Sequence, residues 1–354
     1  MSNLRVLYLY AGARKRNYAA WQQGLEPDTP LVGLNYLKQY NIDAAFFENK
    51  ITEFFRKISF NLTQLPALFV ARSYDAIFSG AGLFTLFIAK VVLRWEHPRW
   101  FIYNTYLSNL LKRNRRGLKA ALIRKAIASA DGIICPSLSQ RDFLVTEGFN
   151  ANRLHYIPYG IDVNFYTKNA NRTKPDIYEP YVFSAGRDVG RDYKTLIQTV
   201  ENEDFHLVIG ALPRNFPGIE HFPKNATVKY FPQIEMPSLY ANAAFVIVPS
   251  IHEEKLVGSD CSGQYVLLEA MASGKAVIIT ERSTRADHFE DGVDGLVVPP
   301  EDPEALKAAI KTLWNDPERA GRMGEHGRQK TLERFTTSKF AEEFAHILLK
   351  NKKD

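Results

Sequence analysis

The stretch Gly263-Gln-Tyr-Val-Leu-Leu-Glu269-Ala-Met-Ala-Ser-Gly274-Lys-Ala-Val-Ile-Ile-Thr280 decides the fold class. Residues 265–272 are typical of a mostly apolar helix, and residues 276–280 form a short apolar run typical of a buried strand. Helices that alternate with such strands build parallel α/β sheets. We therefore expect this stretch to lie in a parallel α/β domain.

The same alternation continues on both sides of this stretch. The expected strands are residues 6–10, 44–47, 76–79, 101–103, 132–135 and 154–157, then 181–184, 206–209, 227–230, 245–248, 276–280 and 296–298. Helices are expected over 118–130, 193–200, 237–243, 265–272 and 303–314, with more up to residue 349. Asp28-Thr29-Pro30 predicts a further helix start, with Leu31, Leu34 and Leu37 on its apolar face. The polar stretch 168–176 predicts a linker between two domains.

Length and composition limit the class of protein. A chain of 354 residues exceeds the usual size of one domain, and 45% hydrophobic with 24% charged residues excludes a disordered chain. Two cysteines, Cys135 and Cys261, exclude a disulfide framework or a four-thiolate zinc site. With no signal-peptide pattern and no uncharged run long enough to span a bilayer, we expect a cytoplasmic protein.

Charge is divided unevenly along the chain. Residues 1–170 carry 22 Lys plus Arg against 11 Asp plus Glu, a net charge of +11, and residues 171–354 carry 23 against 28, a net charge of −5. A basic half indicates an anionic partner, such as a phosphorylated substrate or an acidic membrane. The alternative is an ordinary basic, soluble surface.

The stretch 263–280, continued by Glu290-Asp-Gly-Val-Asp-Gly295, resembles the C-terminal half of retaining, nucleotide-sugar-dependent glycosyltransferases of the family 4 type. The other matching segments are Ser184-Ala-Gly186-Arg187, Arg191 to Ile197, Ile157-Pro-Tyr-Gly160-Ile-Asp162, Val248-Pro-Ser250 and Arg334-Phe-Thr336. The resemblance covers roughly residues 118–345 and implies the GT-B fold, an α/β architecture of two facing Rossmann-like domains. We place the acceptor-binding domain at residues 1–165 plus a C-terminal helix at about 338–354, and the donor-binding domain at 166–337.

Two arginines are the predicted catalytic residues. Arg187 follows an expected strand, Gly186 lets the backbone approach a ligand, and Arg191 lies one short loop further on. Cations that face a leaving diphosphate lower the barrier as its charge grows, and the arginine fork donates two hydrogen bonds to a phosphate. Lys194 is an alternative to Arg191 for this role. If the segment stood alone, the arginines could equally pair with Asp188 and Asp192.

Glu269 is the predicted ribose-binding residue. It interrupts an otherwise apolar helix, where a carboxylate needs a partner, and the resemblance implies that the two ribose hydroxyls supply it. The alternative is a glutamate favoured by the helix dipole. Ser262, Gly263 and Gln264 are expected at the start of this helix, where unpaired backbone N–H groups bind phosphate or sugar hydroxyls.

Two departures from the family pattern are visible. A glutamate expected eight positions before Glu269 is replaced by Cys261, which puts the donor sugar in doubt and predicts a thiol that is accessible at the cleft. Glu253 or Glu254 could take its place, although a capping or solvated role is as plausible. A histidine common in relatives is replaced by the segment that begins at Ser79.

The N-terminal half offers fewer candidates. Gly12 and Ala13 follow the first strand and allow close approach to a ligand, and Asn104 follows another strand, where it could line the acceptor site or cap a turn. No metal-ligand motif is present, so we expect neither a catalytic metal nor a cofactor besides the nucleotide-sugar donor. No nucleic-acid-binding motif accompanies the basic charge.

The resemblance implies transfer of a sugar from a UDP- or GDP-linked donor to an acceptor hydroxyl, with retention of configuration. A sugar-nucleotide epimerase of the same fold and a non-catalytic partner of another glycosyltransferase are the alternatives. Basic residues at 112–125 are interleaved with apolar residues, and a second contact is expected near Phe54. The apolar residues are Leu107, Leu110, Leu111, Leu118, Leu122 and Ile123. This mixture predicts peripheral association with an anionic membrane and a lipid-linked or otherwise anionic acceptor. The alternative is a leucine stripe that faces the core.

Overall fold

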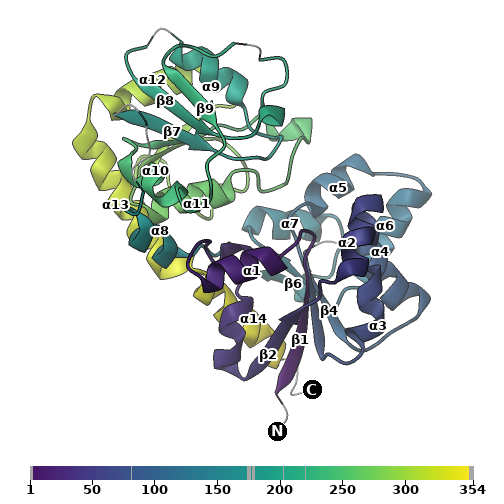
Figure 1. Cartoon of the computed structure of the whole chain (residues 1–354). Helices are drawn as coiled ribbons and strands as arrows, with labels where there is room; N and C mark the ends of the chain where they lie inside the picture. The colour runs from purple at the N-terminus through teal and green to yellow at the C-terminus, as the bar shows by residue number, and fades with distance from the viewer. Residues whose placement is uncertain are drawn as a thin grey trace. The chain divides into compact units, whose positions relative to one another are not determined.

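The computed structural model describes residues 3–350 except residues 81, 174–176, 178–179, 202 and 220. The chain divides into two compact units (Figure 1). The first contains residues up to 23, 28–160 and from 337 onward, and the second contains 24–27 and 161–336. The predicted linker begins inside a helix, and its residues 174–176 lie outside the described residues.

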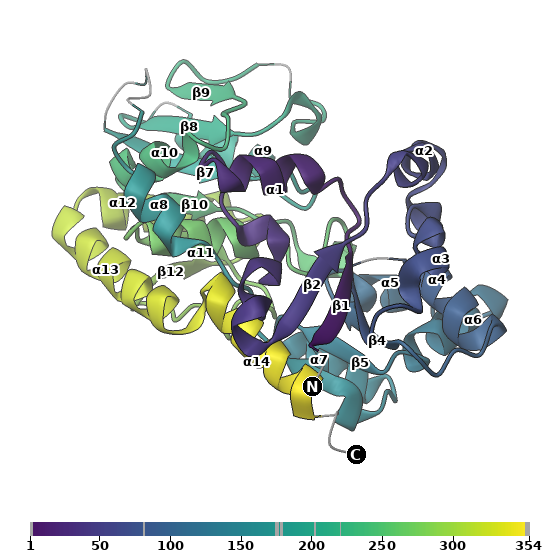
Figure 2. The same cartoon turned by 60° about the horizontal axis from the view of Figure 1, so that its bottom comes forward.

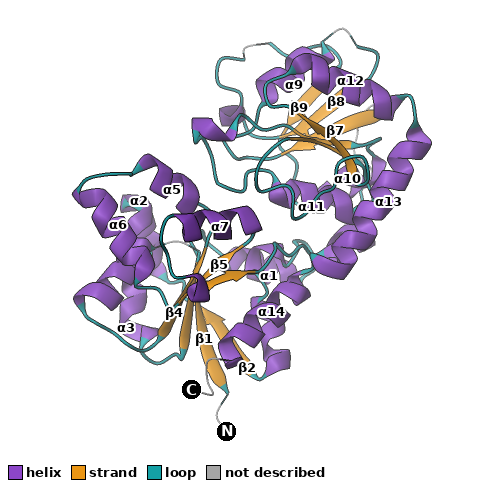
Figure 3. Ribbon diagram, turned by 180° about the vertical axis from the view of Figure 1, so that it is seen from behind, coloured by secondary structure: helices purple, strands orange, loops and turns teal. Residues whose placement is uncertain are grey.

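The first unit is a parallel sheet in the order β2-β1-β3-β4-β5-β6 with helices around it (Figure 3). Its strands are β1 (Leu4–Leu9), β2 (Ile42–Phe46), β3 (Ala76–Ser79), β4 (Arg99–Tyr103), β5 (Gly132–Cys135) and β6 (Leu154–Tyr156). Its helices are α1 (Lys15–Gln22), α2 (Lys50–Ile58), α3 (Leu68–Ala71), α4 (Leu83–Leu86), α5 (Leu107–Arg113), α6 (Leu118–Ala128), α7 (Leu138–Thr146) and α14 (Thr337–Lys350). Short helical turns are η1 (Thr29–Leu31), η2 (Leu34–Tyr40), η3 (Phe60–Leu62), η4 (Leu65–Ala67), η5 (Phe87–Val92) and η6 (Ala151–Arg153).

The second unit is a parallel sheet in the order β12-β11-β10-β7-β8-β9. Its strands are β7 (Tyr181–Ala185), β8 (His206–Gly210), β9 (Ala226–Lys229), β10 (Val246–Val248), β11 (Val277–Thr280) and β12 (Gly295–Val298). Its helices are α8 (Val163–Asn169), α9 (Tyr193–Val200), α10 (Met236–Asn242), α11 (Gln264–Ala272), α12 (Pro303–Trp314) and α13 (Pro317–Arg334), with turns η7 (Pro213–Asn215) and η8 (Glu253–Lys255).

Apolar strand sequences explain both sheets. Strands such as β3, β5, β7 and β11 are buried along their whole length, because helices cover both faces of a parallel sheet. All twelve expected strands are present, so the predicted α/β class is confirmed for each unit. The strand order reverses between β1 and β3 in the first unit and between β7 and β10 in the second. Ligands of doubly wound sheets bind at such points, outside the carboxyl ends of the strands.

The helix expected to begin at Asp28 does not form as one continuous α-helix. The segment makes two short 3₁₀ turns, η1 and η2, separated by Val32 and Gly33 in left-handed conformation. A Cβ at Gly33 would lie 3.0 Å from the Cβ of Ala341, so close packing against α14 imposes the break. The Asp28 carboxylate accepts a hydrogen bond from the Thr337 hydroxyl at 2.7 Å instead of capping a helix. The leucines at 31, 34 and 37 are buried, as expected.

The last helix, α14, packs on the sheet of the first unit although the chain reaches it through the second unit (Figure 1). Phe344 is fully buried and lies against Phe78 and Phe101, with ring centroids 5.0 and 5.7 Å away. Phe340 contacts Phe78 and Tyr103 in the same way. In the described part of the chain, the helices are all too short or too polar to cross a membrane.

Candidate functional site

The candidate site of the second unit lies where its strand order reverses. The loop after β7 and the loop after β10 are tied by backbone hydrogen bonds, from Ile251 N–H to Gly190 C=O at 3.0 Å and from Asp192 N–H to Pro249 C=O at 3.3 Å. The Asp188 carboxylate accepts the N–H of Gly190 at 2.7 Å and the N–H of Ser259 at 3.1 Å. These bonds hold the residues after both strands in one place.

Arg191 lies at the centre of this site. Its side chain is buried, it forms no ion pair with a described residue, and its Nε and Nη1 have no hydrogen-bond partner there. A Cβ at Gly186 would lie 2.5 Å from its Nε, and a Cβ at Gly263 would lie 3.0 Å from its Nη1. Both glycines also have positive φ, +136° and +99°, so only glycine fits beside the guanidinium. A buried cation that forms no ion pair among the described residues and lies between two glycines is suited to an anionic ligand.

Arg187 is exposed and forms no ion pair among the described residues. The alternative that Arg187 and Arg191 pair with Asp188 and Asp192 is wrong, because both carboxylates bind backbone N–H groups. Asp188 bonds the loop, and Asp192 caps α9 by accepting the N–H of Thr195 at 3.0 Å. Lys194 is exposed on the first turn of α9.

Glu269 occupies the middle of α11 and has tyrosine partners. The Tyr240 hydroxyl donates to its Oε2 at 2.7 Å. The pKa of the Glu269 carboxyl is raised, because burial is the largest effect. Hydrogen bonds from Tyr240 and Tyr166 and the charges of Arg191 and Arg187 oppose it. Sequence analysis expected a ribose as the partner and did not predict the tyrosines, which come from α10 and α8. Both helices pack on each other, and α8 also packs on α11.

The start of α11 carries the remaining predicted donor residues. Ser262 is buried and its hydroxyl has no hydrogen-bond partner among the described residues. Gln264 donates from Nε2 to the Thr284 carbonyl at 2.9 Å, so its amide fixes the loop after β11. Its Oε1 has no partner in the described structure. Gly186, Arg191, Ser262, Gly263 and Gln264 are therefore brought together around the two joined loops.

Cys261 is buried, so the predicted accessible thiol is wrong. It lies in the turn that leads into α11, where its carbonyl accepts the N–H of Gln264 at 3.2 Å. Glu253 is a candidate replacement for the missing glutamate, but its carboxylate already accepts a hydrogen bond from the Ser283 hydroxyl at 2.8 Å. Glu254 is exposed.

Arg282 is a residue of this site that sequence analysis missed. It is the second residue after β11 and is buried. Its Nη1 donates to the Ile251 carbonyl at 3.3 Å and its Nη2 to the Asp260 carbonyl at 3.5 Å. Its Nε has no partner and it forms no ion pair among the described residues. The pKa of Arg282 is lowered, because burial is the largest effect. Electrostatic interactions with Glu253, Cys261 and Asp188 oppose it. The sequence signal that could have identified Arg282 is its position just after β11, at the carboxyl edge of the sheet.

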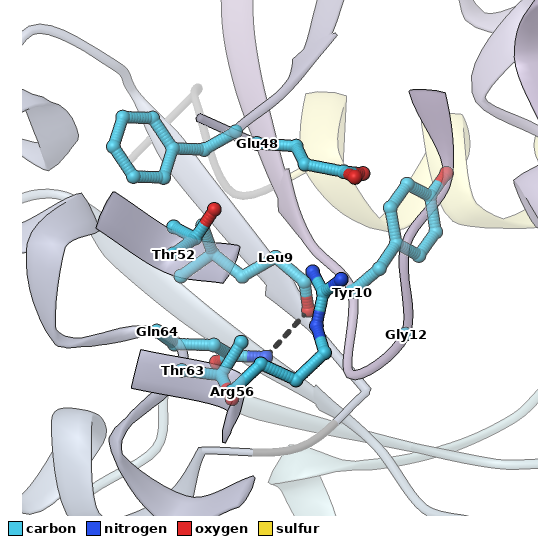
Figure 4. A pocket seen from close by; sticks show the side chains of 9 residues that line it. Leu9, Tyr10, Gly12, Glu48, Thr52, Arg56, Thr63 and Gln64 are labelled. Carbon is cyan, nitrogen blue, oxygen red and sulfur yellow. Dashed lines mark hydrogen bonds between the residues drawn. The ribbon is translucent and has the colours of Figure 1, made fainter. Parts of the chain in front are cut away.

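The N-terminal candidates lie in the first unit. Gly12 lines a shallow pocket beside the first strand, and the Arg56 side chain points into that pocket (Figure 4). Gln64 donates to the Leu9 carbonyl at 2.8 Å and accepts the Ser79 hydroxyl at 3.0 Å, so Ser79 serves to hold Gln64. Ala13 is exposed.

Asn104 does not line a surface, contrary to one of the two expectations for it. It is fully buried, and its Oδ1 accepts the N–H of Leu107 at the start of α5 at 3.0 Å. The capping alternative therefore describes this residue.

Comparisons with known proteins identify the family of the chain. The model of Glycosyltransferase Family 4 matches residues 36–165, and that of Glycosyl transferases group 1 matches residues 192–316. O-antigen chain mannosyltransferase C of Escherichia coli is 33% identical over 82 residues, which are 23% of this chain and 22% of that protein. Alpha-maltose-1-phosphate synthase of Mycolicibacterium smegmatis is 24% identical over 263 residues, 64% of this chain and 65% of that protein. The chain thus spans less than two thirds of the length of either relative.

A solved structure shows the same fold. The crystal structure of HepE from Anabaena in complex with UDP and glucose aligns with a TM-score of 0.69 and 17% identity, covering 98% of this chain and 100% of that chain. The likeness confirms the GT-B fold class that the sequence predicts.

Proposed function

Because the chain belongs to the glycosyltransferase family 4 type, with family models that match both of its halves, we propose that it transfers a sugar from a nucleoside diphosphate to an acceptor hydroxyl with retention of configuration. The observation that carries this proposal is the buried guanidinium of Arg191, whose Nε and Nη1 have no partner among the described residues. Two adjacent phosphates supply the charge and the acceptor atoms that this guanidinium lacks.

In the proposed reaction, the bond between the anomeric carbon and the diphosphate oxygen breaks, and the acceptor oxygen bonds to the same face of that carbon. The acceptor proton goes to a diphosphate oxygen, and the nucleoside diphosphate leaves. Arg187 and Arg191 are assigned to the charge that grows on the diphosphate. This route needs no pair of catalytic carboxylates. Glu269, held by Tyr240, is assigned to the ribose hydroxyls.

Arg282 extends the proposed donor site toward the sugar. It lies near Cys261, at the position where the chain departs from the family pattern, and its Nε is available for a further hydrogen bond. We assign Arg282 to the leaving diphosphate or to a polar group of the donor sugar.

The net charge of the N-terminal half and the name of one relative support a proposal for the acceptor. The relative named O-antigen chain mannosyltransferase C supports a polysaccharide precursor as the acceptor class. The +11 of residues 1–170 supports an anionic or lipid-linked acceptor, met in the cytoplasm at the inner face of a membrane. UDP in the Anabaena complex supports a UDP-linked donor, with GDP as the alternative.

The test is incubation with a panel of UDP- and GDP-sugars, with and without acceptor extracts, followed by mass spectrometry and NMR of the new linkage. The proposal expects nucleoside diphosphate release coupled to a product with the donor's anomeric configuration, unchanged by EDTA. Epimerisation predicts an altered sugar without acceptor. A non-catalytic partner predicts nucleotide binding without turnover. Either result, or loss of turnover on EDTA treatment, contradicts the corresponding part of the proposal.

A further inference from the structure

Four helical segments of the first unit, α2, α3, α4 with η5, and α6, form a contiguous region (Figure 2). The helix α2 contacts η3 and η4, α3 contacts η4, α4 contacts η3 and α6, and η5 contacts α6. We call this region the helical surface.

The helical surface exposes many large apolar side chains. Phe69 is 93% exposed, Leu118 is 77% exposed and Phe54 is 60% exposed. The exposed apolar residues of this region are Ile51, Phe54, Ile58, Phe69, Val70, Phe84, Val92, Leu93, Leu118 and Leu122. Scattered exposed leucines are ordinary, but ten exposed apolar residues on helical segments joined directly or through η3 and η4 indicate an interaction surface.

The orientation of α6 argues against a packing role for its leucines. Its buried residues are Ala120, Ala126 and Ile127, whereas Leu118 and Leu122 are exposed. In α5 the opposite holds, because Leu107 and Leu111 are buried in the core. The expectation of a membrane-facing stripe from Leu107 onward is therefore wrong for α5, where the core-facing alternative is right. It is retained for Leu118 and Leu122 of α6, whereas Ile123 packs against the core.

Cations surround the apolar residues of α6. Residues 112–125 contain seven lysines and arginines and no acidic residue. Arg113, Arg115, Arg116 and Lys119 are exposed, and none forms an ion pair with a described residue. In α2, the exposed cations Lys50 and Lys57 outnumber Glu53, whereas Arg56 points into the pocket beside Gly12. The helical surface thus combines apolar side chains with uncompensated positive charge.

We propose that the helical surface docks on an anionic lipid bilayer. The phenylalanines and leucines enter the boundary between headgroups and acyl chains, and the arginines and lysines contact the lipid phosphates. A nucleic acid would neutralise the cations but leave the apolar residues in water, so a bilayer accounts for both features. This inference rests on the membrane association proposed above and names the surface responsible.

The experiment is co-sedimentation of the whole chain with vesicles of phosphatidylcholine alone or with about 30% phosphatidylglycerol, at low and high salt. One apolar variant is Phe54→Ser with Phe69→Ser, a second is Leu118→Ser with Leu122→Ser, and the charge variant is Arg113→Gln, Arg115→Gln and Arg116→Gln. The matched controls in the same unit are Val145→Ser with Leu349→Ser, and Lys15→Gln, Arg16→Gln and Lys38→Gln. All these control residues are exposed and lie outside the helical surface.

The wild type should bind the anionic vesicles, more weakly as salt rises, and bind phosphatidylcholine poorly. The charge variant should lower the partition coefficient about a hundredfold, and each apolar variant about tenfold, while both controls bind as the wild type does. Equal loss in a control, equal binding to both kinds of vesicle, or preference for RNA over vesicles would overturn the inference. The vesicle experiment contains neither donor nor acceptor, so a failure to bind vesicles would not contradict the proposed transfer reaction.

Discussion

Arg191 should lower the stability of the protein without nucleotide and raise it when a nucleotide is bound. Its guanidinium is buried without an ion-pair partner among the described residues, which lowers the stability of the protein without nucleotide. We predict that Arg191→Met, similar in length but uncharged, leaves the melting temperature without nucleotide unchanged or raised. Near-saturating UDP should stabilise the wild type by about 3 kcal/mol, a shift of about 5 to 10 °C, and should not shift the variant. Thermal unfolding with and without UDP is the measurement.

Kinetics tests the catalytic role of both arginines. If the proposed assignments hold, Arg191→Met and Arg187→Ala should each lower kcat/KM about 100-fold to 1000-fold. A variant at Arg214, exposed in the same unit, serves as the control. Should Arg191→Met melt much earlier than the wild type in the absence of UDP, the arginine would have a structural role instead.

His288 is a buried group that ties stability to pH. Burial lowers its pKa to about 4, and the charges of Arg334 and Lys330 act in the same direction. A folded-state pKa below the unfolded value of about 6.5 means that the unfolded chain binds the proton first. Stability is therefore full above pH 6.5 and falls by about 3 kcal/mol as pH drops toward 4. We predict that His288→Leu removes this part of the pH dependence in urea titrations. An unchanged slope between pH 6.5 and 4 would contradict the assignment.

At the level of single residues, the sequence predicted the site where a motif coincided with a strand end. Gly186 and Arg191 follow β7 and obey that rule, whereas Gly263 belongs to the motif that begins α11; the three come together in the structure. Arg282 also follows a strand but belongs to no motif, and Tyr240 reaches Glu269 only through the packing of α10 on the sheet. The burial of Cys261 depends on how its loop folds, and spacing alone carries no information on that.

At the level of elements, strands were more predictable than turns. A strand buried on both faces is a short apolar run, and all such runs became strands within two residues of the expected bounds. The segment after Asp28 has a good helical pattern but forms η1 and η2, because Gly33 must pass close to Ala341 of α14. That contact joins residues about 300 positions apart, and a local pattern does not encode it.

The helix α14 should contribute strongly to the stability of the first unit. Phe344 is fully buried among Phe78, Phe101 and Tyr8. We predict that Phe344→Ala lowers the free energy of unfolding by about 3 to 5 kcal/mol, because a large cavity replaces the ring. Leu349→Ala on the same helix is the control, since Leu349 is exposed and should change stability by less than about 1 kcal/mol. Urea unfolding is followed by tryptophan fluorescence in a Trp314→Phe background, because the other three tryptophans, Trp21, Trp95 and Trp100, all lie in the first unit. Similar losses in both variants would show that α14 is not anchored by this aromatic cluster.

At the level of the whole molecule, the chain leaves its first unit at Gly160 and returns to it at Thr337, so each unit carries its own core. The charge follows the same division, with the cations concentrated in the N-terminal half and the anions in excess beyond it. This division fits two tasks, donor binding in the second unit and contact with an anionic acceptor or surface in the first.

Nucleotide binding should therefore protect one unit selectively. All residues assigned to the donor lie in the second unit, in the loops after β7, β10 and β11 and in α11. A ligand that binds only the folded state slows the opening of the elements that form its site. We predict that UDP slows hydrogen exchange most in β7, β10 and the start of α11, and leaves β1, β3 and β4 close to their rates without ligand. The measurement is hydrogen exchange with mass spectrometry at a UDP concentration about 100 times Kd, where protection of about 100-fold is expected for amides that exchange through unfolding of that unit. Arg191→Met is the control and should show no protection. Protection centred on the pocket beside Gly12 would instead place the nucleotide in the first unit, and the donor assignment would have to be reversed.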